Sequence, residues 1–366
     1  MDKKLVIKGT DIAKNVAVLR DKVKDARIYA VLKANAYGMG LLPFAKELID
    51  SGIRNFAVTD LSDALILREN FPEAETLLLT PCYQSEDVEK AVLSSVTLTV
   101  DSFENAQLIS QISAANSKTT TIHIKIDTGM GRYGFLPSQT EEIQNACDLE
   151  NINAEGIYTH LHSAFNKKEA PSIKQFELFK NVIFALKENG YEFPIRHICN
   201  SIAIFRFPQM HLTAVRAGSA LIGRVNAVCG NTNLCKVGVL YGQVIDIRTL
   251  PAGHNIGYAA LFKTKAKQKI ICVNVGYSDG VAVTKANDTF RFIDILRYGF
   301  NDFKLLFNKP ELICTVGGKK AKSLGRIGMT NLVLDAQNLY NVEIGDEVLI
   351  PANPIYISPL IKREYR

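Results

Sequence analysis

The sequence predicts an α/β chain, with an N-terminal TIM-type (β/α)8 barrel followed by a mostly β domain. Short runs rich in β-branched residues alternate with stretches of helical period over roughly the first 225 residues. Eight such runs occur, the number that closes a parallel barrel. From about residue 234 the apolar runs are separated by Gly and Pro, with little room for helices, which predicts a separate β domain. We therefore place the domains at residues 1–232 and 233–366.

The elements follow from these runs in order. The predicted barrel strands are 27–32, 55–59, 76–79, 97–100, 121–126, 154–160, 195–199 and 215–217. Between them, the helical period predicts helices at 42–50, 61–70, 86–93, 102–114 and 172–189, the last of which stops at an Asn-Gly pair. In the second domain, the runs 240–250, 269–276, 312–318 and 330–336 are expected to be strands.

Composition excludes several classes of protein. A net charge of +6 from 43 basic and 37 acidic residues is mild, and no basic run interleaves with aromatics as a nucleic-acid groove would. No apolar run reaches the roughly 20 residues of a membrane span, and the charged N-terminus lacks a signal-peptide stretch, so we expect a cytoplasmic protein. The seven scattered cysteines lack zinc-site spacing and predict free thiols and no metal site.

The first predicted strand delivers Lys33 at its C-terminal end, followed at once by the loop ANAYGMG. In a (β/α) barrel the loops at these strand ends converge on one mouth, where the chemistry collects. A solvated lysine is the ordinary interpretation of this position. The functional alternative is a partly desolvated lysine, whose lowered pKa allows it to form a Schiff base.

Further candidates lie at other strand ends. Arg132 follows a glycine-rich turn and could bind a carboxylate with two hydrogen bonds. His160 ends the sixth strand, where a hydrogen-bonded structural histidine is the commoner case. Ser201 can open a helix and offer hydroxyl and N–H groups to a phosphate, and Gly218 and Ser219 end the eighth strand. Phosphate sites in such barrels recur after strands seven and eight.

Several motifs together resemble one family. The stretch AVLKANAYGMG is similar to the cofactor-lysine signature of alanine racemases, which bind pyridoxal 5'-phosphate (PLP), with Met39 replacing the usual histidine. The resemblance continues in order through most of the chain, in the segments KIDTGMGR (125–132), HICNS (197–201), GHNIGY (253–258), GYSDG (276–280) and GRIGMT (325–330). It implies a PLP-dependent homodimer that interconverts L-alanine and D-alanine, with D-alanine supplied to peptidoglycan.

The resemblance also implies site residues. Lys33 and Tyr258 would be the two catalytic bases, with Tyr258 contributed by the partner subunit. The cofactor would bind Lys33, Tyr37, His160, Asn200, Ser201, Arg216, Gly218, Ser219 and the backbone of Ile222; the substrate would bind Arg132, Met329 and Tyr277. His197 would connect Tyr258 to Arg216, and Lys125, which is carbamylated in some members, would position Arg132.

Arg216 would face the pyridine nitrogen of the cofactor. An arginine cannot hand over its proton near neutral pH, so this nitrogen should stay unprotonated. The electron sink is thereby weakened, which fits an enzyme that returns the proton to carbon instead of decarboxylating or transaminating.

The sequence departs from the family pattern at Gly328 and Thr330, where Cys and Asp are usual, and it lacks the longer C-terminal segment whose tyrosine binds phosphate, for which Tyr356 is a weak substitute. Alternatives therefore stay open. A racemase of serine, lysine or arginine fits the same motifs. A decarboxylase of basic amino acids is expected to carry a glutamate in place of Arg216, a PLP homeostasis protein to lack the β domain, and an ordinary barrel enzyme to bind no PLP.

Overall fold

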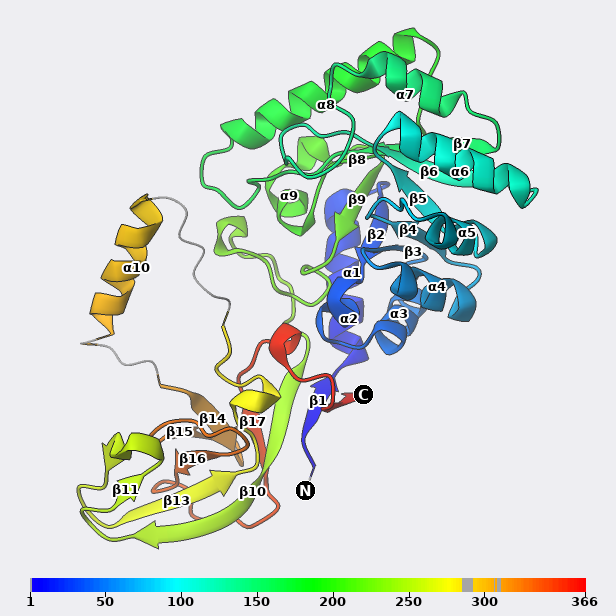
Figure 1. Ribbon diagram of the computed structural model, residues 1–366. Coiled ribbons are helices and arrows are strands. Elements are labelled where there is room, and N and C mark those ends of the chain that lie inside the picture. Colours follow the sequence, from blue (N-terminus) through cyan, green and yellow to red (C-terminus); the bar gives the residue numbers. More distant parts are fainter. Residues whose placement is uncertain (1, 285–291, 306, 308–310) are drawn as a thin grey trace. The chain divides into compact units, whose positions relative to one another are not determined.

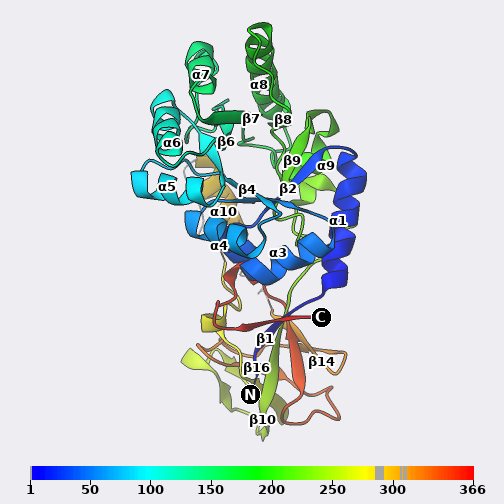
Figure 2. The ribbon, with the colours of Figure 1, turned by 90° about the vertical axis from the view of Figure 1, so that its right-hand side faces the viewer.

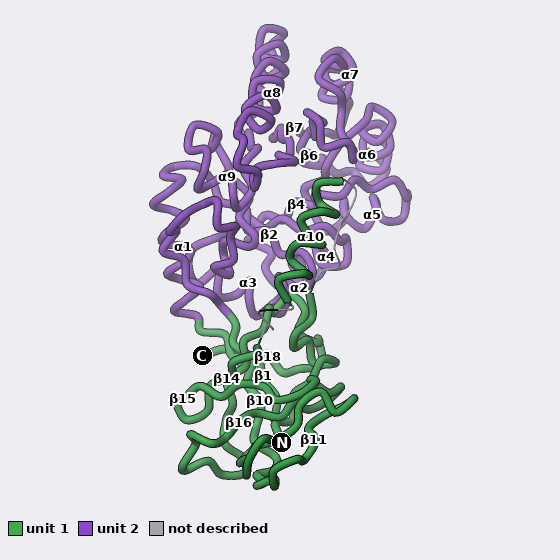
Figure 3. The backbone as a smooth tube through the Cα atoms, turned by 90° about the vertical axis from the view of Figure 1, so that its left-hand side faces the viewer, with its two compact units in different colours: residues 1–8, 238–366 green, residues 9–237 purple. Residues whose placement is uncertain are grey.

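The computed structural model describes the whole chain except residues 1, 285–291, 306 and 308–310. Two compact units are present, one of residues 9–237 and one of residues 1–8 together with 238–366 (Figure 3). The sequence predicts that residues 1–8 belong to the barrel, and the structure differs. They group with the β unit because β1 (Lys4–Ile7) pairs with β10 (Val239–Leu250) and β18 (Lys362–Tyr365).

In the first unit, strands β2 to β9 close into a parallel barrel, which confirms the predicted fold (Figure 1). Each predicted strand is present, with ends that shift by at most two residues. The strands are β2 (Arg27–Val31), β3 (Asn55–Val58), β4 (Glu75–Leu78), β5 (Thr97–Val100), β6 (Thr120–Lys125), β7 (Ile152–Tyr158), β8 (Ile195–His197) and β9 (Ala214–Ala217).

Helices surround these strands (Figure 2). They are α1 (Gly9–Val23), α2 (Lys33–Tyr37), α3 (Leu41–Asp50), α4 (Leu61–Asn70), α5 (Ser85–Leu93), α6 (Phe103–Ala115), α7 (Thr140–Cys147), α8 (Ala170–Glu188) and α9 (Ser201–Arg206), with short 3-10 turns at Pro208–Met210 and Ala227–Cys229. Local signals set their ends: the Ser102 hydroxyl caps α6 by accepting from the backbone N–H of Asn105 at 3.1 Å. The apolar positions Ala106 and Ile109 are fully buried on the inner face of that helix.

The second unit is mostly β, as predicted. Its main sheet has the order β15-β14-β17-β10-β1-β18, and β13 pairs with both β10 and β16. The remaining strands are β11 (Asn255–Ile256), β12 (Phe262–Lys263), β13 (Gln268–Val273), β14 (Ile313–Val316), β15 (Lys319–Lys322), β16 (Leu332–Asp335) and β17 (Glu347–Ile350), with 3-10 turns at Tyr258–Ala260, Tyr277–Asp279 and Pro354–Tyr356.

One prediction for this unit is wrong. The region was expected to hold little room for helices, yet α10 (Phe292–Lys304) runs for 13 residues. Its apolar residues recur at helical spacing, and Phe292, Leu296, Phe300 and Phe303 are exposed in the chain. Among the described helices, none is both long and apolar enough to cross a membrane. The seven cysteines are free thiols, as predicted.

Candidate active site

A pocket of about 260 Å³ opens at the C-terminal ends of the barrel strands. Most of the residues that the sequence singled out in this unit line it together, although their positions in the chain are far apart. The predicted lining residues are Lys33, Tyr37, Arg132, His160, Asn200, Ser201, Arg216, Gly218 and Ser219; the others are Val31, Thr59, Leu79, Tyr133, Tyr158 and Ile202.

Lys33 follows β2 and lines the mouth, where its side chain is still open to solvent. Partial burial by the pocket walls and the nearby charge of Arg132 lower the pKa of its amine below the ordinary 10.5. Its Nζ lies 6.0 Å from the centre of the Tyr37 ring. Near neutral pH a larger fraction of this amine is therefore neutral and nucleophilic than in an ordinary lysine.

The residues after Lys33 form a left-handed turn, a conformation that costs a residue with a side chain about 1–2 kcal/mol. The Asn35 side chain holds the turn by accepting from the backbone N–H of Leu41 at 2.8 Å. The turn brings the Tyr37 hydroxyl so close to Gly218 that a side chain there would overlap it. Burial raises the pKa of Tyr37 to about 12, so its hydroxyl stays a hydrogen-bond donor. The φ angles are Ala34 53°, Asn35 54°, Ala36 52° and Tyr37 55°.

Two neighbouring side chains organise the loops after β8 and β9. Asn200 caps α9 by accepting from the backbone N–H groups of Ile202 and Ala203, both at 3.1 Å. The Ser201 hydroxyl accepts from the N–H of Gly218 at 2.9 Å and of Ala220 at 3.2 Å, which leaves its own proton free to be donated. Ile222 is buried and does not line the pocket.

Arg216, on β9, lines the pocket and is otherwise buried. Its Nη2 donates to the carbonyl of Thr159 at 2.8 Å and to His160 Nδ1 at 3.2 Å. Burial lowers the pKa of Arg216 to about 10, which still leaves it protonated near neutral pH. Burial, helped by the charge of Arg216, holds the pKa of His160 well below its usual 6.5, so this imidazole is neutral.

The structure corrects the connection expected through His197. Its Nδ1 accepts from Arg216 Nη1 at 2.7 Å, and its Nε2 lies 3.0 Å from His123 Nδ1. The ring is fully buried and is stacked between Tyr29 and Tyr158. With both ring nitrogens engaged inside the barrel, His197 has no atom left for a tyrosine hydroxyl at the mouth.

Arg132 is carried by a loop that Asp127 shapes. The Asp127 carboxylate accepts from the backbone N–H groups of Gly129, Met130 and Gly131 at 2.7–3.1 Å. Burial acts to raise the pKa of this carboxyl, but these donors outweigh it and the net pKa is lowered. The loop is thus held in one conformation, with the Arg132 guanidinium 4.7 Å from the centre of the Tyr133 ring.

Lys125 ends β6 below this loop and is almost fully buried. Its Nζ donates to the Ile126 carbonyl at 2.7 Å and lies 5.4 Å from the centre of the Tyr158 ring. Burial, with the charge of Arg216, lowers the pKa of Lys125 to about 7. Lys125 and His197 therefore lie behind the pocket instead of lining it.

The remaining predicted residues belong to the β unit, where they lie on loops that meet. The backbone N–H of Tyr277 donates to the Gly328 carbonyl at 3.0 Å, next to Met329. The turn before Tyr258 packs against the same segment, because a side chain at Gly325 would overlap the Ile256 carbonyl. Tyr258, Tyr277 and Met329 are all exposed in the chain.

Sequence reasoning missed Tyr158 and His123. Tyr158 is the last residue of β7, two residues before His160, and its hydroxyl contacts the Thr99 hydroxyl at 2.9 Å. His123 likewise lies two residues before Lys125 on β6. Both pairs lie within predicted strands, 121–126 and 154–160, and residues two apart along a strand are expected on the same side, so a search at that spacing from each candidate would have found both.

Comparison with known proteins gives the family. Residues 7–225 match the model described as "Alanine racemase, N-terminal domain", and residues 237–357 match "Alanine racemase, C-terminal domain". The chain belongs to the alanine racemase family. The resemblance inferred from the sequence motifs is thereby confirmed for both units.

Relatives within the family match over nearly the whole chain. An alanine racemase of Methanococcus maripaludis is 33% identical over 349 residues, which covers 92% of this chain and 87% of the relative. One of Desulforamulus reducens is 32% identical over 350 residues, 92% of this chain and 88% of the relative. The solved alanine racemase of Clostridium difficile 630 is 26% identical, with a TM-score of 0.86 over 100% of this chain and 96% of that one.

Proposed function

We propose that this protein interconverts L-alanine and D-alanine with the help of bound PLP. The observation that carries the proposal is the shared pocket of Lys33, Arg132 and Arg216, in which an amine of lowered pKa faces the same cavity as two guanidinium groups. Such a pocket suits a covalently held anionic cofactor and the carboxylate of an amino acid. The relatives named alanine racemase, similar over 92% of the chain, support alanine as substrate.

The groups that line the pocket match the parts of PLP that they would bind. The Lys33 amine can hold the aldehyde carbon. The Tyr37 hydroxyl, the free proton of Ser201 and the backbone at Ser219 would hold the phosphate, and the missing side chain at Gly218 leaves room for the Tyr37 hydroxyl beside them; Ile222, which does not line the pocket, is left out of this set. When bound, PLP would withdraw electrons from the α-carbon of the amino acid and acidify its C–H bond.

Arg216 would tune this chemistry. Its guanidinium stays protonated near neutral pH and has no acceptor atom, so it would donate to the ring nitrogen without giving up a proton. Asn200 would support the cofactor from the neighbouring loop. An unprotonated ring nitrogen favours return of the proton to carbon over decarboxylation, and this supports racemase chemistry over that of a decarboxylase.

Two bases would act on opposite faces of the α-carbon. The Nζ of Lys33 would move the proton on the D face, and the Oη of Tyr258 from a second copy of the chain would move it on the L face. A homodimer is therefore part of the proposal. Tyr258 is 69% exposed in its own chain, which is consistent with a role at a subunit contact.

We propose that His160, and not His197, assists Tyr258. The guanidinium of Arg216 can only donate, so His160 Nδ1 is an acceptor and the neutral ring carries its proton on Nε2. That N–H would donate to the phenol oxygen and stabilise its deprotonated form.

Arg132 would bind the substrate carboxylate, together with the backbone N–H of Met329 and, at the entrance, Tyr277. We propose that Lys125 is carbamylated and supports Arg132. A pKa of about 7 leaves much of the Lys125 amine neutral at physiological pH, and only a neutral amine reacts with carbon dioxide. A mass increase of one carbon dioxide unit, lost in Lys125→Met, would show it.

We place the enzyme in the cytoplasm, where its product would supply D-alanine for peptidoglycan. The reaction itself is tested by mixing the purified protein and PLP with L-alanine in heavy water. We expect D-alanine to form with deuterium at the α-carbon, and an absorbance band at about 420 nm that Lys33→Ala abolishes. If neither deuterated D-alanine nor the absorbance band appears, the proposal is contradicted.

A second candidate substrate class follows from one observation. Gly328 and Thr330 stand where the family pattern has Cys and Asp, next to the segment that holds Met329. Serine, lysine and arginine should therefore be assayed beside alanine, with carbon dioxide release as the readout for decarboxylation. Faster deuterium exchange at the α-carbon of one of these amino acids would make it, instead of alanine, the proposed substrate. The racemase chemistry would be unchanged.

A further inference from the structure

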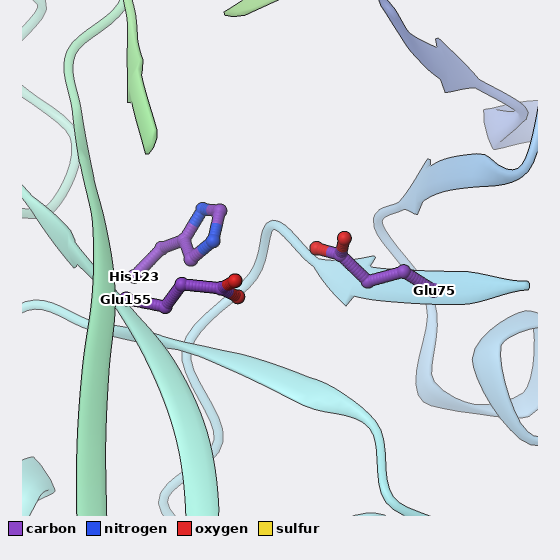
Figure 4. Close-up of side chains that lie close together, drawn as sticks. All are labelled: Glu75, His123 and Glu155. Carbon is purple, nitrogen blue, oxygen red and sulfur yellow. The ribbon is translucent and has the colours of Figure 1, made fainter. Parts of the chain in front are cut away.

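A chain of hydrogen bonds continues from Arg216 away from the pocket, into the interior of the barrel. Arg216 Nη1 lies 2.7 Å from His197 Nδ1, and His197 Nε2 lies 3.0 Å from His123 Nδ1. Both histidines are fully buried. Beyond His123 lie two half-buried carboxylates, those of Glu75 and Glu155, with one oxygen of each and a ring nitrogen of His123 all within 4.8 Å of one another. Figure 4 shows these three side chains pointing toward one another.

Arg216, the first residue in this series of hydrogen bonds, fixes the direction of every bond in it. A guanidinium has no acceptor, so His197 Nδ1 must accept and the proton of His197 must be on Nε2. That proton is donated to His123 Nδ1, and the proton of His123 must then be on Nε2. Burial, with the charges of Arg27 and Arg216, lowers the pKa of His123 to about 3, and burial holds that of His197 well below 6.5, so both rings are neutral.

The series of hydrogen bonds ends at the Nε2–H of His123, a donor that needs an acceptor. His123 Nε2 is buried and has no hydrogen-bond partner among the described residues. Glu75 already accepts from the Tyr29 hydroxyl at 2.5 Å, from Asn55 at 2.8 Å and from Arg27 at 3.1 Å. The carboxylate of Glu155 has no hydrogen bond or ion pair within the described part of the chain, so it is the acceptor at hand.

The backbone is built to place these two groups. Ile122 pairs with Ala154, whereas His123 pairs with Gly156, so Glu155 is the extra residue of a β-bulge in β7. A bulge redirects the side chain that it adds. The His123 ring packs so closely on Gly156 that any side chain there would overlap it. Both features concern the interior of the barrel and not the pocket.

We propose that His123 and Glu155 are positioning residues, which hold the proton of His197 on Nε2 and thereby fix the orientation of the Arg216 guanidinium. Without an acceptor below it, the Nε2–H of His197 would be a buried donor with no partner. That cost favours the tautomer with the proton on Nδ1, where it would oppose a donor of Arg216 and displace the guanidinium. The catalytic consequence rests on the proposed function, because it is there that Arg216 faces the cofactor. The positions of the protons do not depend on that function.

A metal ion in the same cluster is the competing interpretation, and the bond directions oppose it. A metal would take the lone pair of His123 Nε2, which moves the proton of His123 to Nδ1 and that of His197 to the nitrogen facing Arg216. Arg27 also already pairs with Glu75.

The first test reads the protons directly, by long-range hydrogen–nitrogen NMR of the PLP-loaded protein labelled with 15N in its histidine rings. We expect His123 and His197 to carry their protons on Nε2. His123→Phe should change the protonated nitrogen of His197 or give a mixture, whereas His123→Asn, whose amide oxygen replaces Nδ1, should preserve it. His211→Phe removes a buried histidine outside the chain of bonds and is the matched control. A proton on Nδ1 of His197 in the unaltered protein would overturn the proposal.

The second test measures alanine racemisation. In His123→Phe we expect kcat to fall about tenfold or more with KM nearly unchanged, and His123→Asn to recover most of it. Glu155→Leu changes a half-buried residue and serves if His123→Phe does not fold; it should shift the His123 resonance and lower kcat in the same sense. Unchanged histidine resonances and kcat in Glu155→Leu would overturn the proposal, as would stoichiometric Zn²⁺ binding lost in that variant. An unaltered protein that fails to racemise alanine would contradict the proposed function alone.

Discussion

At the scale of single residues, the buried amine of Lys125 couples the pocket to the stability of the fold. Burial lowers its pKa from the ordinary 10.5 to about 7. Between these values the unfolded chain binds a proton that the folded chain does not. The free energy of unfolding must therefore rise with pH across this window, and below it the buried charge is a constant penalty.

Lys125→Met should remove this pH dependence. Relative to the variant, we expect the free energy of unfolding of the unmodified protein to rise by up to about 1.4 kcal/mol per pH unit from about pH 7 to about pH 10. Urea unfolding in buffer free of carbon dioxide measures both proteins under the same conditions. Parallel pH profiles would mean that the pKa of this amine is not lowered.

Single residues also show what sequence could and could not predict. Lys33 and Arg216 could be placed in the mouth because strand ends in a parallel barrel converge there. The partner of His197 could not be predicted, because it depends on which side chains meet inside the closed barrel. His123 fills that position from a strand 74 residues away, and the resemblance alone suggested a tyrosine instead.

At the scale of elements, β-branched runs that alternate with stretches of helical period predicted the barrel strands. Two irregular features could not be predicted in this way. The bulge at Glu155 depends on the register between β6 and β7, which no single strand encodes. The left-handed turn at 34–37 is formed by residues with side chains, although glycine is the usual signal for positive φ. Helix α10 was not predicted for another reason: its apolar residues recur at helical spacing, but the Gly and Pro residues of this domain indicated strands and turns.

The left-handed turn makes a prediction that reverses the usual effect of glycine. Ala34 is exposed with φ 53°, so Ala34→Gly should relieve strain and leave the free energy of unfolding unchanged or raise it by up to about 1 kcal/mol. Ala114→Gly, exposed in the right-handed helix α6, should lower it by about 0.5–1 kcal/mol. Chemical denaturation of the two variants compares them. Equal losses in both would show that the turn is not left-handed in solution.

At the scale of the whole molecule, the two units carry different parts of the proposed site. The barrel unit holds Lys33, Arg132 and Arg216 in one pocket, and the β unit gathers Tyr258, Tyr277 and Met329 on loops that touch. The change in sequence pattern at about residue 234 predicted the change from βα units to strands. Whether Tyr258 acts within its own chain or in a second copy is not encoded in either unit alone, because each unit folds around its own core.

Mixing two inactive variants decides between these arrangements. Lys33→Ala and Tyr258→Phe are each expected to lose nearly all racemase activity. If the bases come from different chains, unfolding and refolding an equal mixture makes about half of the dimers mixed, and each mixed dimer has one site with both bases, so about a quarter of the unaltered activity should return. If both bases belong to one chain, no combination restores a site and the mixture stays inactive. Refolding each variant alone is the control, and an inactive mixture that nevertheless contains mixed dimers would contradict the shared site.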